Sequence, residues 1–255
     1  RISLSSQNRS GTEPGRNTRT NRNSSMEQLL VALDVDSMDR ALTLADKLRG
    51  HVGGFKVGSQ LYTVAGPEVV RSLSKCGDRV FLDLKFHDIP NTVAGAVRSA
   101  AEMGVWMLTV HASGGHDMLR AAKEAAGNEG PRIVAVTLLT SLDDADLSHL
   151  GITQRPLADH VVALAELAQR AGVDGAVASP REIKVIRAAC GPSFTIVTPG
   201  IRPVSVAQGA DDQRRTATAA SAVAAGANFL VVGRPIIESP DPLAASKQLA
   251  EVLNP

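Results

Sequence analysis

The residues of this sequence with the clearest chemical potential form a short run, Asp83-Leu84-Lys85, followed closely by Asp88. Apolar and polar residues alternate from Val80 to Lys85 with a period of two, which is typical of a β-strand and puts Asp83 and Lys85 on the same face. An ammonium group held among carboxylates stays protonated, because opposite charges favour its charged form. Such a group acts as an acid rather than a nucleophile, and it can deliver a proton to a developing carbanion.

Two earlier charged residues, Asp34 and Lys56, each lie between apolar neighbours. If they belong to strands next to the one that carries Asp83 and Lys85, two carboxylates and two ammonium groups share one interior. Folding alone does not favour this arrangement, because desolvated charges are costly unless they are tightly paired. A cluster of this kind is more typical of a functional site. The alternative is a purely structural ion pair between Asp83 and Lys85.

The elements that must position these residues repeat along the chain as a short apolar strand, a polar turn and an amphipathic helix. Eight such units in 255 residues predict a (β/α)8 barrel, whose active sites lie at the C-terminal ends of the strands. An open doubly wound sheet is the alternative, but no Gly-x-Gly-x-x-Gly follows the first strand. The expected strands span residues 29–35, 54–58, 79–85, 106–111, 132–139, 175–178, 195–198 and 229–232. The expected helices span residues 38–48, 67–75, 92–103, 116–126, 157–171, 181–189, 216–225 and 242–253.

Composition and charge agree with one α/β domain that buries a sizeable core. Hydrophobic residues make up 44% of the chain and aromatic residues only 3%, which is typical of a parallel sheet covered by helices. Residues 1–25 contain five arginines and few apolar residues, so we expect a disordered Arg-rich leader before a single domain at 26–255, with Met26 as the natural start. The rest of the chain is slightly acidic, which gives little support for a nucleic-acid partner.

Cysteine usage and hydropathy bear on location. Cys76 and Cys190 lie far apart and form no metal-ligand spacing, which predicts a reduced, cytoplasmic setting. No run approaches the roughly 18 apolar residues of a membrane span, so no membrane partner is expected.

Two segments near the C-terminus, 198–202 and 232–235, leave the expected seventh and eighth strands. In (β/α)8 barrels the loops after these strands frequently bind phosphate through backbone N–H groups and a nearby cation. Gly233 permits close backbone approach, and Arg202 and Arg234 supply planar donor groups. The alternative is that both arginines are solvated residues on the rim.

The loop at residues 203–214 is polar, contains glycine and shows no strand or helix pattern. Loops of this length on a compact fold are often lids. Gln213 near its end could therefore reach a bound phosphate ester.

The segment from Asp83 to Thr92, DLKFHDIPNT, resembles the signature of the orotidine 5′-phosphate decarboxylase family. The short loop from Leu142 to Leu150 is similar to that of bacterial members. Further segments match the family in the same order between Leu29 and Leu253: 32–34, 55–58, 109–112, 136–141, 198–202, 212–215 and 232–235.

The resemblance implies decarboxylation of orotidine 5′-monophosphate to UMP and CO2, the last step of UMP synthesis, without a metal or an organic cofactor. It implies that Lys85 protonates C6 of the pyrimidine within a tetrad of Lys56, Asp83, Lys85 and Asp88. Asp88 and Thr92 would enter the site from the second subunit of a homodimer, although Thr92 could instead be an ordinary helix residue.

The resemblance also implies contacts to each part of the substrate. The expected contacts are Asp34 and Lys56 at the ribose hydroxyls, Thr140 at the pyrimidine, and Arg202, Gln213, Gly233 and Arg234 at the phosphate or its lid. Three histidines lie near these segments. We expect His87 and His111 to pack or form hydrogen bonds rather than catalyse, and His116 to lie on the surface at a helix start.

Two other functions remain open. The first is a Mg²⁺-dependent sugar-phosphate decarboxylase or hexulose-phosphate synthase of the same suprafamily, but Lys56 stands where a metal site would prefer a carboxylate. The second is a barrel without catalytic activity that binds a nucleotide, which would bind UMP and never consume orotidine 5′-monophosphate.

Overall fold

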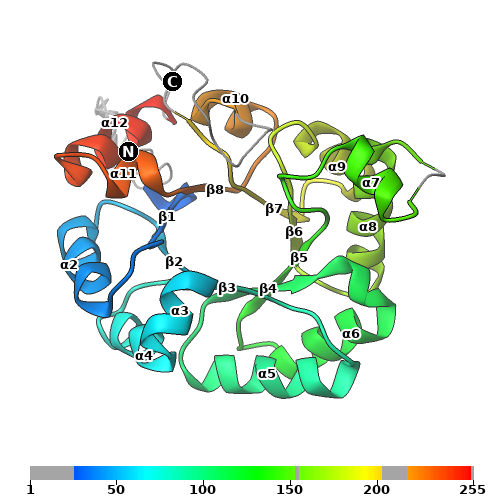
Figure 1. Ribbon diagram of the computed structural model, residues 1–255, viewed down its shortest axis with the longest axis horizontal. Coiled ribbons are helices and arrows are strands. Elements are labelled where there is room, and N and C mark those ends of the chain that lie inside the picture. Colours follow the sequence, from blue (N-terminus) through cyan, green and yellow to red (C-terminus); the bar gives the residue numbers. More distant parts are fainter. Residues whose placement is uncertain (1–25, 153–154, 203–216, 254–255) are drawn as a thin grey trace, which may run out of the picture.

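A computed structural model of the chain describes residues 26–152, 155–202 and 217–253. Within them, eight parallel strands close into a barrel in sequence order, and helices surround the barrel (Figure 1). This confirms the predicted (β/α)8 fold. The strands are β1 (Leu29–Ala32), β2 (Gly54–Gly58), β3 (Val80–Phe86), β4 (Met107–His111), β5 (Arg132–Val136), β6 (Gly175–Val177), β7 (Thr195–Thr198) and β8 (Phe229–Val232). The helices are α2 (Met38–Leu48), α3 (Ser59–Ala65), α4 (Pro67–Lys75), α5 (Pro90–Glu102), η1 (Ala112–Gly114), α6 (Gly115–Ala126), α7 (Asp144–His149), α8 (Leu157–Arg170), α9 (Ile183–Cys190), α10 (Ala219–Ala224), α11 (Arg234–Ile237) and α12 (Pro242–Val252).

Several predicted bounds differ from the observed ones. The first strand ends at Ala32 and the fifth at Val136, so Asp34 and Thr140 lie in loops beyond the strands. Three short α-helices, α3, α7 and α11, and the 3-10 helix η1 were not predicted. For α7 a signal was present, because Asp143 and Asp146 form a capping box at its N-terminus. Residues 1–25, where a disordered leader is predicted, and residues 203–216 of the expected lid lie outside the described part of the chain.

Apolar side chains fill the barrel interior below the charged residues. This inner cluster contains Leu30, Ala32, Phe81, Met107, Val134, Val197 and Val231. The alternating residues of the same strands, such as Val31 and Leu82, point outward and pack against the helices, as the period of two requires. Phe81 is 1% exposed, and truncating a buried Phe to Ala typically costs about 3–5 kcal/mol. The packed interior therefore fixes the strands whose C-terminal ends carry the charged residues.

Strand β3 departs from regular pairing at the charged run. Leu82 pairs with Leu108 and the next recorded pair is Phe86 with Val110, so β3 advances four residues while β4 advances two. Lys85 lies in this irregular stretch with a φ of 54°, the only positive φ of a non-glycine residue in the described ranges. Such a conformation costs on the order of 1–3 kcal/mol and is found mostly at functional sites.

The opposite end of the barrel, at the N-termini of the strands, is closed by aromatic and cationic side chains. The guanidinium groups of Arg79 and Arg132 lie 5.4 Å and 5.8 Å from the centroid of the Trp106 ring. The Trp106 ring also meets Phe229 edge-on, with centroids 5.3 Å apart. These contacts seal the end of the barrel that lies away from the charged row.

No helix in the described ranges has both the length and the apolar character that crossing a lipid bilayer requires.

Candidate active site

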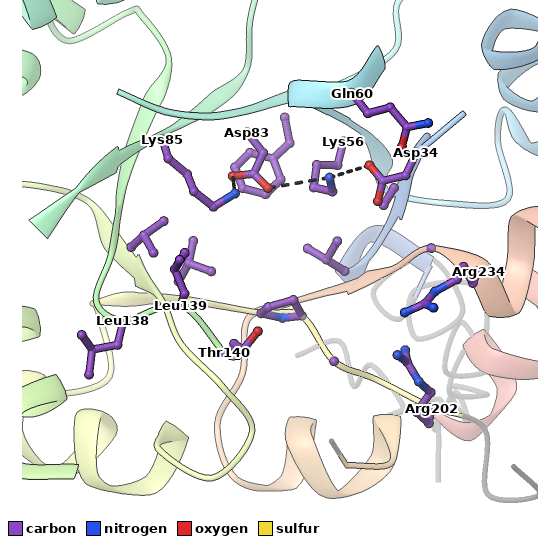
Figure 2. A pocket seen from close by; sticks show the side chains of 18 of the residues that line it. Asp34, Lys56, Gln60, Asp83, Lys85, Leu138, Leu139, Thr140, Arg202 and Arg234 are labelled. Carbon is purple, nitrogen blue, oxygen red and sulfur yellow. Dashed lines mark hydrogen bonds and ion pairs between the residues drawn. The ribbon is translucent and has the colours of Figure 1, made fainter. Parts of the chain in front are cut away.

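Four charged side chains alternate in sign along one wall of a cavity at the C-terminal end of the barrel (Figure 2). Lys56 Nζ lies 3.0 Å from Asp34 Oδ1 and 3.7 Å from Asp83 Oδ2. Lys85 Nζ lies 3.0 Å from Asp83 Oδ1. We call Asp34, Lys56, Asp83 and Lys85 the charged row. Because each carboxylate faces at least one ammonium group, the desolvation cost of the four charges is partly offset.

The carboxyl group of Asp83 has an environment with opposing effects on its pKa. Burial favours the neutral acid, but the charges of Lys56 and Lys85 and hydrogen bonds from Lys85 and Thr109 outweigh it. The net result is a pKa below the ordinary aspartate value. Asp83 is therefore a carboxylate at neutral pH.

Two side chains of the charged row approach each other over Gly58, the last residue of β2. A Cβ atom at this position would lie 2.8 Å from Lys56 Nζ and 3.2 Å from Asp34 Oδ1. Any larger residue would push the ammonium or the carboxylate away. Gly58 therefore provides the space for the contact between Asp34 and Lys56.

The cavity has a volume of about 550 Å³, which is within the usual range for small-molecule sites. Its far end, away from Lys85, carries Arg202 and Arg234, whose guanidinium groups are turned toward each other (Figure 2). Two cations so placed favour an anion between them. The lining residues are Ala32, Asp34, Lys56, Gln60, Phe81, Asp83, Lys85, Val136, Leu138, Leu139, Thr140, Val177, Pro199, Gly200, Arg202, Val231, Gly233, Arg234 and Glu238.

Comparisons with known proteins identify the family of this chain. The model described as "Orotidine 5'-phosphate decarboxylase / HUMPS family" matches residues 27–249. The chain belongs to this family. Orotidine 5′-phosphate decarboxylase of Moorella thermoacetica is 51% identical over 88% of this chain and 91% of its own length. The protein of the same name from Geotalea daltonii is 49% identical over 91% of this chain and 98% of its own length.

A solved structure agrees with these sequence matches. The crystal structure of orotidine 5′-phosphate decarboxylase from Lactobacillus acidophilus superposes with a TM-score of 0.79 at 37% identity, covering 89% of this chain and 99% of that one. The resemblance seen in the sequence is thus confirmed. The description of the family names a second group, HUMPS, beside the decarboxylase. Membership of the family by itself therefore does not choose between the decarboxylase and the hexulose-phosphate synthase considered from the sequence.

The structure brings most of the residues predicted from the family resemblance into one cavity. Asp88 and Thr92 are exceptions, because both side chains are exposed and neither lines this cavity of their own chain. Gln213 lies outside the described residues. The predicted residues that line the cavity are Asp34, Lys56, Asp83, Lys85, Thr140, Arg202, Gly233 and Arg234.

Sequence reasoning missed several residues of the site. Gln60 and Glu238 belong to the unpredicted short helix α3 and the end of α11, so no pattern indicated them. Thr109 is different, because it is a polar residue inside the apolar strand β4. Its hydroxyl is fully buried and contacts Asp83. A polar residue on the inward face of a predicted strand was the signal that could have found it.

His87 and His111 stack on each other with ring centroids 5.2 Å apart, and neither lines the cavity. His111 Nδ1 lies 2.8 Å from Ser113 Oγ. Burial, followed by the charges of His87 and Lys85, lowers the pKa of His111. The expected packing and hydrogen-bonding roles agree with these contacts. His116 is exposed in the first turn of α6, as expected.

Proposed function

We propose that this chain decarboxylates orotidine 5′-monophosphate to UMP and CO2, the last step of UMP synthesis, without a metal ion or an organic cofactor. The observation that carries the proposal is the charged row on one wall of a cavity whose far end holds two arginines. Relatives named orotidine 5′-phosphate decarboxylase, at 51% and 49% identity, support the choice of substrate.

The cavity suggests one orientation of the nucleotide. The phosphate would lie against Arg202 and Arg234, because planar guanidinium groups match phosphate oxygens. The ribose hydroxyls would lie at Asp34 and Lys56, at the end of the charged row opposite to Lys85. The pyrimidine would then occupy the end near Lys85, with Thr140 on the opposite wall (Figure 2).

In this orientation the substrate carboxylate lies beside Asp83. Repulsion between the two carboxylates raises the free energy of the bound acid, and it disappears when CO2 leaves. The binding of the remote phosphate supplies the free energy that holds the two groups together. The C6–carboxylate bond breaks and its electron pair stays on C6. Lys85 Nζ then donates a proton to C6 and is reprotonated from solvent.

The charges around Lys56 favour this metal-free reaction over the Mg²⁺-dependent alternative. Lys56 Nζ lies between Asp34 and Asp83, at 3.0 Å and 3.7 Å from their carboxylate oxygens, and occupies the place where a divalent cation would need an oxygen ligand. No group of three or more His, Cys, Asp or Glu side chains suited to a metal occurs among the described residues. Full activity in excess EDTA is expected, and loss of activity in EDTA would favour the alternative.

Loss of the orotidine 5′-monophosphate absorbance in the presence of EDTA tests the proposed function directly. Lys85→Ala should lower kcat at least about 100-fold, because a positioned general acid contributes roughly 10²–10⁴ in rate. Lys75→Ala, at the exposed C-terminal end of α4, is the matched control. A decrease of less than about tenfold for Lys85→Ala would show that another group donates the proton. UMP binding without consumption of the substrate would instead favour a barrel without catalytic activity.

We also propose that the active form is a homodimer in which Asp88 and Thr92 complete the site of the partner subunit. The segment that carries them is exposed in the single chain, and Ile89 within it is 67% exposed, so a second subunit has room to cover it. Lys56, Asp83 and Lys85 would then form the catalytic tetrad with the partner's Asp88.

Mixing two inactive variants tests this arrangement. In a heterodimer of Lys85→Ala and Asp88→Asn subunits, one site carries both substitutions and the other carries neither. Activity should therefore return when the two variants are unfolded together and refolded. Two variants that stay inactive after mixing would contradict the shared site.

Two further proposals concern the rest of the chain. Residues 26–255 would form the whole catalytic domain, so removing residues 1–25 should leave kcat and KM unchanged within about twofold.

A cytoplasmic location is proposed from the two free cysteines, Cys76 and Cys190. Fractionation of cells that express the chain would test it.

A further inference from the structure

We propose that Thr109 is a positioning residue whose hydroxyl fixes the Asp83 carboxylate and the Lys85 backbone in one arrangement. Thr109 lies in β4 on the inward face of the barrel, next to the irregular part of β3. The effects on kinetics that this proposal predicts rest on the proposed function, whereas the effects on the structure and on the pKa of Asp83 do not.

The Thr109 hydroxyl has two partners at hydrogen-bonding distance. It accepts a hydrogen bond from the Lys85 backbone N–H, with N and Oγ1 2.8 Å apart. It donates its own hydrogen to Asp83 Oδ1 at 3.0 Å. The same carboxylate oxygen accepts a hydrogen bond from Lys85 Nζ at 3.0 Å. The Lys85 ammonium group thus binds this oxygen of Asp83 directly, and the Lys85 backbone is joined to the same oxygen through the Thr109 hydroxyl.

The Thr109 hydroxyl accepts the hydrogen bond of the Lys85 backbone N–H, for which regular strand pairing would have supplied a backbone carbonyl. Between the pairs Leu82–Leu108 and Phe86–Val110 the ladder of β3 and β4 is interrupted. The Lys85 N–H donates there to the Thr109 side chain, while Lys85 itself has a φ of 54°. A residue with a Cβ rarely adopts this conformation without support from its surroundings. Without the hydroxyl, the Lys85 backbone can return to an ordinary conformation and move its ammonium group.

The same hydroxyl acts on the charge of Asp83. The charged groups that face Asp83 among the described residues are Lys56 from β2 and Lys85 from β3, and Thr109 from β4 adds a neutral donor. Hydrogen bonds to a carboxylate favour its charged form, and the bond from Thr109 contributes to the lowered pKa of Asp83. Removal of the hydroxyl should therefore raise the pKa of Asp83.

A set of four variants separates positioning from simple loss of packing. Thr109→Val keeps the shape and removes the hydroxyl, whereas Thr109→Ser keeps the hydroxyl. Thr137→Val is the matched control, because Thr137 follows the next strand, is also fully buried, and donates only to the Val177 carbonyl, at 3.2 Å. If Thr109→Val does not fold, Thr109→Ala, which also lacks the hydroxyl, takes its place in the same measurements.

Thr109→Val should lower kcat for orotidine 5′-monophosphate roughly 10- to 100-fold with KM changed less than about threefold, because misplacement of a reacting group affects the chemical step. Thr109→Ser and Thr137→Val should stay within about threefold of the wild type. The acid limb of the kcat/KM profile should move to higher pH in Thr109→Val alone. A kcat within threefold of Thr137→Val, no recovery with serine, or an unmoved acid limb would each overturn the inference.

A second readout keeps this inference separate from the proposed function. If the wild type does not consume orotidine 5′-monophosphate, the proposed function fails, but the hydroxyl can still be tested by NMR titration of the Asp83 carboxyl carbon. Its pKa should be higher in Thr109→Val than in the wild type, and Thr109→Ser should resemble the wild type. Equal values in all three proteins would overturn the role of Thr109.

Discussion

The two ends of the barrel pair carboxylates with cations in different ways. At the N-terminal end, Arg49 binds Asp78 with two parallel hydrogen bonds, Nε to Oδ1 at 2.9 Å and Nη2 to Oδ2 at 2.8 Å. The Asp78 side chain is 5% exposed. At the C-terminal end, Asp83 faces two lysines with longer and less regular contacts, and the side chain of Lys85 is 36% exposed to the cavity.

The difference shows how one fold separates stability from chemistry. The guanidinium group of Arg49 occupies both oxygens of Asp78, and its hydrogen bonds to Asp78, then to Asp46, raise its pKa above the ordinary arginine value. Such a group cannot give up a proton. Lysine ammonium groups are point charges with rotatable donors, so they can hold a carboxylate and still reach a substrate. The arginine end therefore stabilises the barrel, and the lysine end can do chemistry.

The largest effect is expected from Asp83→Asn in the charged row. This change removes the carboxylate that faces both lysines while it keeps the size of the side chain. It should lower kcat/KM for orotidine 5′-monophosphate on the order of 10²- to 10³-fold, as expected for a preorganised electrostatic group. Steady-state assays would measure the change. A loss of less than tenfold would mean that the charged row does not set the rate.

The matching change at the other end, Asp78→Asn, should affect stability instead of rate. It removes the buried one of the two carboxylates that bind Arg49, which should lower the free energy of unfolding by about 1–3 kcal/mol. Urea unfolding would measure the loss, and kcat of the folded enzyme should stay near the wild-type value. Asp46→Asn is the control, because Asp46 pairs with Arg49 on the surface and should cost less than about 1 kcal/mol. A large kinetic defect in Asp78→Asn would break the comparison.

The smallest expected effect is a loss of stability of the wild type at acid pH. The pKa of Asp83 in the folded chain lies below the ordinary value of 3.8, so its ionisation stabilises the fold above that pH. This stabilisation is lost as the pH falls through the lower folded-state pKa. The wild-type free energy of unfolding should therefore fall relative to that of Asp83→Asn below about pH 4, by at most about 1.4 kcal/mol per pH unit. Urea unfolding at a series of pH values would measure it, and a relative gain for the wild type on acidification would contradict the assignment.

Much of the site could be predicted from local sequence patterns. The alternation from Val80 to Lys85 indicated a strand with Asp83 and Lys85 on one face, and the Nζ–Oδ1 contact of 3.0 Å bears this out. The eight repeated units indicated the barrel and its C-terminal rim. These inferences succeed because a strand or helix leaves its period in consecutive residues, whatever the rest of the chain does.

Other features follow only from contacts between distant segments. The interrupted pairing of β3 with β4, the φ of Lys85 and the Thr109 hydroxyl depend on how residues more than twenty positions apart are aligned. Strand register is a tertiary property, because the same alternation is compatible with several alignments until neighbouring strands and helices choose one.

The sequence by itself therefore determined the fold class, the inward face of each strand and the charges that share it. Only the tertiary structure decided three features of the site: the order of charges along the cavity wall, the placement of Arg202 and of Arg234 at the start of α11 at one end of the cavity, and the backbone conformation of Lys85. Composition and periodicity are read along the chain, whereas the direction of a side chain in a site is set by neighbours that the chain brings together only when the barrel closes.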